Sequence, residues 1–243
     1  MNIHAFIFSW KNHFDRACEL EDQIGKLVRT TVINSENTPA AIRRGWQCMD
    51  ESTFFAAKWN KLLDLFQGDL LFNVMADASI VDIKLLIEKA VAATTKYNLG
   101  IYEPNVDYTD VHYNTSRLQA LAPGLMLVPR TDCTCWFVHG DILRRSLPAN
   151  TSVTTYGWGI DIALAAKSYL LGRRVARDYS VLVKHPRSRG YSTDAAMEQM
   201  HRYFQTLEPS HERITLKLYR ESMLLSQTDF RPDGMEQHLV STK

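Results

Sequence analysis

Two glycines flank a tryptophan in the stretch Gly157-Trp158-Gly159-Ile160-Asp161, and a carboxylate closes it. Glycine weakens helices and strands, so this pair favours a loop whose backbone passes close to another group. The apolar run 162–166 predicts a helix, which places Asp161 in its first turn. There the helix dipole favours the ionised carboxylate. Asp161 is therefore either a general base or, in the alternative interpretation, a helix cap.

A second carboxylate, Asp77, follows the apolar run 70–75 and is flanked by the small residues Ala76 and Ala78. The run predicts a buried strand, and an acid placed directly after it indicates a catalytic or metal-binding role. His185 follows another strand region, 174–183, which Asp178 interrupts. His185 fits a metal ligand and an exposed surface histidine equally well.

The elements that must position these residues alternate between strand and helix. Short spacing between successive elements predicts parallel strands and an α/β fold class. Strands are expected at 3–8, 27–33, 70–75, 99–102, 125–128, 135–138 and 174–183. Helices are expected at 14–24, 52–66, 83–94, 141–145, 162–171 and from 193 onward, and a polar loop at 103–117. Ligands bind outside the carboxyl ends of parallel strands, where the polar residues gather.

Composition narrows the function classes. The chain has 243 residues, a net charge of +1 and four cysteines. The near-zero charge argues against a nucleic-acid partner, and the cysteine pattern is that of reduced thiols. We expect a cytoplasmic protein without a leader or spanning segment, with basic clusters that leave peripheral contact at the inner face of a membrane open. The oligomeric state is not indicated.

With Asp77-Ala78-Ser79 at a strand end and Gly157-Trp158-Gly159-Ile160-Asp161 downstream, the chain resembles the nucleotide-sugar-dependent glycosyltransferases of the GT-A fold. In that family an Asp-x-Asp motif holds a divalent metal, a Gly-Trp-Gly motif with a Glu-Asp pair presents the acceptor-side acid, and a late histidine completes the metal site. The resemblance covers most of the first 190 residues. It implies a mostly parallel, Rossmann-like central sheet flanked by helices, with helices at the C-terminus.

The resemblance implies one domain, 1–243, made of a nucleotide-binding half (1–100), an acceptor-side half (101–192) and a helical extension (193–243). Asp161 would be the catalytic base and Asp77 and His185 the ligands of Mn²⁺ or Mg²⁺, with Trp158 and Gly159 on the acceptor side. The nucleotide sugar would contact Phe8, Ser9, Trp10, Asn34, Ser35, Glu36, Lys58, Ala76, Asp77 and Ser79. Lys58 or Arg187 would assist as a fixed cation.

Two positions depart from the family pattern. Ser79 stands in place of the second metal-binding Asp, and Ile160 in place of the first acid of the Glu-Asp pair.

The activity that the resemblance implies is transfer of a hexosyl or N-acetylhexosaminyl group, with inversion, from a UDP- or GDP-sugar to a glycan or lipid-linked acceptor, as in polysaccharide biosynthesis.

Two alternatives stay open. The incomplete Asp-x-Ser motif fits a non-catalytic module that binds a sugar nucleotide or glycan, or a degenerate subunit of a glycosyltransferase complex. A nucleotidyltransferase would carry a glycine-rich phosphate loop after its first strand, but the sequence there is Ser9-Trp10-Lys11-Asn12.

Overall fold

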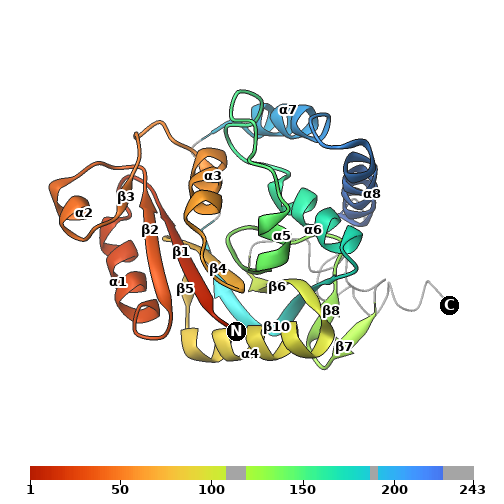
Figure 1. The fold of residues 1–243 in the computed structure, drawn as a ribbon, viewed down its shortest axis with the longest axis horizontal. Coiled ribbons are helices and arrows are strands. Elements are labelled where there is room, and N and C mark those ends of the chain that lie inside the picture. Colours follow the sequence, from red (N-terminus) through yellow and green to blue (C-terminus); the bar gives the residue numbers. More distant parts are fainter. Residues whose placement is uncertain (108–118, 187–190, 227–243) are drawn as a thin grey trace.

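The computed structural model describes residues 1–107, 119–186 and 191–226, with side chains up to residue 221. A single ten-stranded sheet runs through these residues, with helices on both of its faces (Figure 1). Its strand order is β3-β2-β1-β4-β9-β6-β10-β8-β7, and β5 pairs with β10 outside this path. The strands are β1 (Ile3–Ser9), β2 (Arg29–Asn34), β3 (Gln47–Cys48), β4 (Leu70–Met75), β5 (Ser79–Ile80), β6 (Leu99–Val106), β7 (Ala120–Ala122), β8 (Leu125–Leu127), β9 (Cys135–His139) and β10 (Arg174–Lys184).

The N-terminal part of the sheet is parallel. β1 pairs with β2 and with β4 in parallel, and β3 extends the same run. Helices make the crossovers, as short strand-to-helix spacing requires. The helices are α1 (Phe14–Ile24), α2 (Pro39–Arg43), α3 (Phe55–Leu65), α4 (Ile83–Tyr97), α5 (Gly140–Arg144), α6 (Ile160–Leu170), α7 (Thr193–Phe204) and α8 (Pro209–Ser226).

β9 is inserted between β4 and β6 and runs antiparallel to both. Its direction has a consequence for the site, because the start of an antiparallel strand lies at the same edge as the ends of its neighbours. The backbone N–H of Met75, at the end of β4, donates to the carbonyl of Thr134, just before β9, at 2.8 Å. The loop that precedes β9 therefore lies at the carboxyl edge of β4 and β6.

Side chains alternate between the two faces of the sheet and build two cores. On β1, Ala5 and Ile7 pack with α1 and α4, whereas Phe6 and Phe8 pack with the core formed by α3, α5, α6 and α7. Figure 1 shows α4 and α6 on opposite sides of the central strands. Burial on both faces explains why these strands are almost continuously apolar. No helix in the described part of the chain has the length and apolar character needed to cross a bilayer.

The expected α/β class with a mostly parallel central sheet is confirmed, and the bounds of several elements differ from those expected. The predicted strand 99–102 continues to Val106, so Glu103 lies inside β6 and is buried, not in a polar loop. The remainder of that predicted loop, 108–118, is outside the described residues. The break predicted at Asp178 is a bulge in the pairing of β10 with β6. The short elements α2, β3, β5 and β7 were not predicted.

Candidate active site

The ends of β1 and β2 bring several predicted nucleotide-binding residues together. Ser9 and Asn34 are register partners on these strands, and both are buried. Asn34 donates through Nδ2 to the carbonyl of Glu36 at 2.7 Å, while the hydroxyl of Ser35 donates to the carbonyl of Thr53. The buried atoms Ser9 Oγ and Asn34 Oδ1 have no hydrogen-bond partner among the described residues. Buried polar atoms are normally paired, so these two are free to meet a ligand.

Lys58 lies directly behind these strand ends. It is a fully buried residue of α3, not an exposed cation, and its Nζ donates to the Ser9 carbonyl and lies 3.8 Å from the ring centroid of Trp10. Burial lowers the pKa of Lys58 to about 6. Phe8 is enclosed in the core against Phe55, with ring centroids 5.2 Å apart, so Trp10 and not Phe8 presents an aromatic ring at the surface.

Asp77 and His185 meet at the same edge, as the sequence predicted. The Asp77 Oδ1 and His185 Nε2 atoms lie 3.0 Å apart, an ion-pair distance without the angles of a hydrogen bond. Burial opposes ionisation of both groups, but the contact outweighs it: the pKa of Asp77 is lowered and that of His185 is raised. The His185 backbone N–H donates to Asp107 at 3.1 Å, which fixes the histidine at the end of β10. Ala76 is buried, and its N–H donates to the Phe8 carbonyl at 2.8 Å.

The donor set of this pair fits a divalent cation completed by other ligands. Two ligands about 2.1 Å from an octahedral ion and at right angles lie about 3 Å apart, which matches the Asp77–His185 separation. Asp77 Oδ1 is buried and accepts no hydrogen bond from the described residues. Those residues contain no group of three His, Cys, Asp or Glu side chains that could hold a metal. Ser79, on β5, is exposed and pairs with Lys184 in the sheet.

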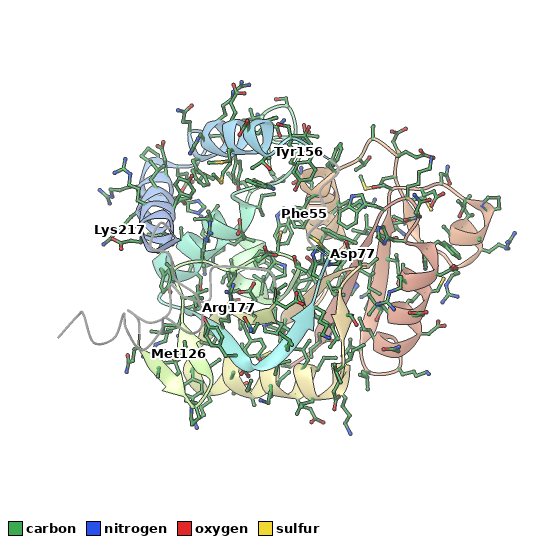
Figure 2. All side chains as sticks on the ribbon, turned by 180° about the vertical axis from the view of Figure 1, so that it is seen from behind. Phe55, Asp77, Met126, Tyr156, Arg177 and Lys217 are labelled. Carbon is green, nitrogen blue, oxygen red and sulfur yellow. The ribbon has the colours of Figure 1, made fainter. Side chains whose placement is uncertain are left out.

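The Gly157-Trp158-Gly159 stretch is a loop that leads into α6, and both glycines are required by their surroundings. Their φ angles are +79° and +88°. A Cβ on Gly157 would lie 2.6 Å from the Phe55 ring, and one on Gly159 would lie 2.5 Å from the Phe204 ring. The loop therefore passes tightly between α3 and α7. Figure 2 places Tyr156, just before the loop, close to Phe55.

Asp161 lies in the first turn of α6, and Gly159 occupies the N-cap position. The first-turn placement of Asp161 is confirmed, and backbone N–H groups of that turn lower its pKa, as expected of a carboxylate that stabilises a helix start. Burial raises the pKa of Asp161 to about 6, although the Arg130 charge acts in the opposite direction and Asp132 acts in the same one. Asp161 as a whole residue is half-buried, and the enclosure of its carboxyl group is the main cause of the raised pKa. A pKa near neutrality suits a general base.

An aromatic cluster of Phe54, Tyr156, Trp158 and Tyr191 adjoins this loop. Tyr156 and Tyr191 stack with centroids 4.4 Å apart, and Phe54 meets both rings edge-on. The indole N–H of Trp158 donates to the hydroxyl of Tyr191 at 2.9 Å. Trp158 is thus held by Tyr191, which follows His185 in the chain. Arg187, the predicted assisting cation, is outside the described residues.

Sequence reasoning missed Arg130 and Asp132, which precede β9 and whose charges act on Asp161. It also missed Glu103 on β6, which accepts the backbone N–H of Asp132 and pairs with Arg177. The sequence signals Asp132 only through its place before a β-prone run, and that run does not reveal the direction of the strand in the sheet. Asp178 lies on the opposite face of the sheet, where it accepts from Tyr102 at 2.9 Å, and is structural.

Solved structures of similar shape identify the fold. A mannosyltransferase from Pyrobaculum calidifontis in complex with GDP-Man and Mn²⁺ matches with a TM-score of 0.60 and 15% identity, covering 99% of this chain and 79% of that one. TarS from S. aureus matches with a TM-score of 0.62 and 13% identity, covering 98% and 78%. The chain has the GT-A fold.

A third GT-A structure is glucosyl-3-phosphoglycerate synthase from Mycobacterium tuberculosis, in complex with Mn²⁺, UDP-glucose and phosphoglyceric acid. It matches with a TM-score of 0.56 and 18% identity, covering 86% of this chain and 79% of that one. No protein-family model and no curated protein matches the sequence. The predicted GT-A fold is thus confirmed, at identities that carry no information on substrate.

Proposed function

We propose that the chain is a glycosyltransferase that transfers a hexosyl or N-acetylhexosaminyl group, with inversion, from a UDP- or GDP-sugar to a glycan or lipid-linked acceptor. The observation that carries the proposal is the position of Asp161. Its carboxylate, with a pKa of about 6, begins α6, and the charge of Asp132 acts both on it and on His185, the partner of Asp77. The complexes of the structural neighbours with GDP-Man and UDP-glucose support a sugar nucleotide as donor.

In this proposal Asp161 accepts the proton of the acceptor hydroxyl while that oxygen attacks the anomeric carbon. The bond between the anomeric carbon and the diphosphate oxygen breaks on the opposite side, which inverts the configuration. The pKa of Asp161 keeps the carboxylate ionised at neutral pH yet basic enough to take the proton.

The leaving diphosphate carries negative charge that the site must balance. Asp77 and His185 would hold a divalent ion, Mn²⁺ or Mg²⁺, and that ion, when bound, would supply charge stabilisation for the diphosphate. Lys58 holds the Ser9–Trp10 segment in place from behind. The buried acceptor atom Asn34 Oδ1 would receive an N–H from the base.

Calorimetric titration with UDP and with GDP, with and without MnCl₂, tests the donor side of the proposal. We expect one nucleotide to bind, more tightly with Mn²⁺. Asp161→Asn is expected to keep that affinity and to lose transfer by at least about 100-fold, the range for loss of a general base. Asp64→Asn, an exposed change on α3, is the matched control and should behave as wild type.

Failure of both nucleotides to bind would contradict the proposal, and full transfer by Asp161→Asn would remove the base assignment.

A second candidate function rests on Ser79, which replaces the second acid of the family motif. Nucleotide binding that ignores metal, together with no turnover of any sugar nucleotide, would favour a non-catalytic binding module.

A further inference from the structure

Asp132 lies just before β9, and the direction of that strand brings it to the ligand-binding edge. Thr134, two residues later, accepts the backbone N–H of Met75 at 2.8 Å. Asp77 follows Met75 by two residues on the neighbouring strand. Asp132 and Asp77 therefore continue past the same point of the sheet edge, from strands that run in opposite directions.

The backbone of Asp132 is held by a buried ion pair. Its N–H donates to Glu103 Oε1 at 2.6 Å, and the other oxygen of Glu103 accepts from Arg177 Nε at 2.8 Å. Glu103 and Arg177 are both fully buried, and Figure 2 shows Arg177 within the central strands. An ion pair that is costly to bury and serves to hold one loop residue indicates that the position of that residue matters.

The carboxylate of Asp132 is also fixed in direction. Its Oδ1 accepts the backbone N–H of Thr134 at 2.8 Å, so the side chain folds back over its own turn. On one side, the turn of Asp132 adjoins the end of β4, which Asp77 follows. On the other side, the charge of Asp132 acts on Asp161, so Asp132 lies between the metal-binding side and the base.

The proposed reaction places the transferred sugar between the metal-binding side and the base. In a single displacement the anomeric carbon lies between the leaving diphosphate and the attacking hydroxyl, so the sugar ring lies between the Asp77–His185 pair and Asp161. A carboxylate beside that ring accepts hydrogen bonds from sugar hydroxyls, and its charge stabilises the positive character that develops on the ring. The described residues contain no three-residue metal-binding group, which favours the sugar over a metal as the partner of Asp132.

We propose that Asp132 binds hydroxyl groups of the transferred sugar and is a specificity-determining residue of the donor site. This inference rests on the proposed function. Sugar binding would then fall to the loop before β9. That loop is distant in sequence from the nucleotide-binding residues at the ends of β1 and β2, and β9 pairs with neither strand.

The experiment compares the affinity of the nucleotide with that of the sugar nucleotide. Wild type, Asp132→Asn and the control Asp64→Asn are titrated with UDP, UDP-glucose, UDP-N-acetylglucosamine, GDP and GDP-mannose in the presence of MnCl₂. For the preferred donor, we expect Asp132→Asn to bind the nucleoside diphosphate within about twofold of wild type. Its affinity for the sugar nucleotide should fall at least about tenfold, the effect of losing a charge-assisted hydrogen bond.

Asp132→Asn keeps an oxygen that can accept from Thr134, so the turn should survive, and thermal unfolding verifies this. Equal losses of affinity for the nucleotide and the sugar nucleotide would overturn the inference, because they would indicate a role in the diphosphate or metal site. Unchanged affinity for both ligands would also overturn it. Failure of the proposed function differs from both, because wild type would then bind no nucleoside diphosphate.

Discussion

Asp161 has two properties that a general base needs, and each comes from a different part of its surroundings. Burial raises its pKa to about 6, while Arg130 and backbone N–H groups of the first turn of α6 limit the rise. The carboxylate is therefore ionised at pH 7 and still basic. These properties cost stability, because the ionised carboxylate is less well solvated in the folded chain than in the unfolded one.

This cost predicts that Asp161→Asn stabilises the protein. The folded pKa of Asp161 lies above its unfolded value of about 3.9, so the native state is penalised once pH rises above that value, and the penalty is complete above about 6. We expect the variant to gain roughly 1–2 kcal/mol at pH 7.5 and almost nothing at pH 3.5. Urea unfolding at the two pH values measures this. A variant less stable than wild type at pH 7.5 would show that Asp161 is structural.

The sequence predicted Asp77, Asp161 and His185 because each follows or begins a strongly apolar element. Asp132 could not be found in the same way. Its position depends on β9 running antiparallel between β4 and β6, and the apolar pattern of a strand does not encode its direction. The shift in pKa of Asp161 was equally hidden, since it comes from residues distant in the chain.

At the scale of elements, the loop before α6 leaves no room for a side chain at either of its glycines. Gly159 combines a φ of +88° with close packing against Met200 and Phe204 of α7. The sequence predicted that the backbone passes close to another group there, but not which group, because α7 lies in a segment read only as a C-terminal extension. The loop thus couples the base on α6 to the packing of α7.

Gly159→Ala should separate this packing from backbone strain when compared with Gly172→Ala. Gly172 also has a positive φ, +69°, but a Cβ there would meet nothing within 4 Å. We expect Gly172→Ala to cost about 1 kcal/mol from strain alone. Gly159→Ala should cost about 3 kcal/mol or more, because the added methyl must displace a ring, and it should also reduce transfer. Denaturant unfolding gives both values, and equal costs would contradict the packing argument.

At the scale of the whole molecule, the two predicted halves share one sheet. β4, from the first half, is covered by β9, from the second, and β9 in turn pairs with β6. A nucleotide-binding half of residues 1–100 would leave β4 with an open edge. The two halves therefore do not form separate sheets.

We accordingly predict one cooperative unfolding transition. The five tryptophans are distributed over both halves, with Trp10, Trp46 and Trp59 in the first and Trp136 and Trp158 in the second. Fluorescence and far-ultraviolet circular dichroism should give coincident urea midpoints, as a two-state protein requires. Two separated midpoints would show instead that the halves unfold independently.

The insertion of β9 has a consequence for the protein during its synthesis. Chains are made from the N-terminus, so β1, β2 and β4 leave the ribosome long before β9. Until residue 139 has emerged, the buried edge of β4 has no partner and its apolar residues, such as Leu71 and Phe72, stay open to other chains. The nascent protein passes through a stage at which a bound chaperone would protect it, and slowing translation before β9 should increase aggregation.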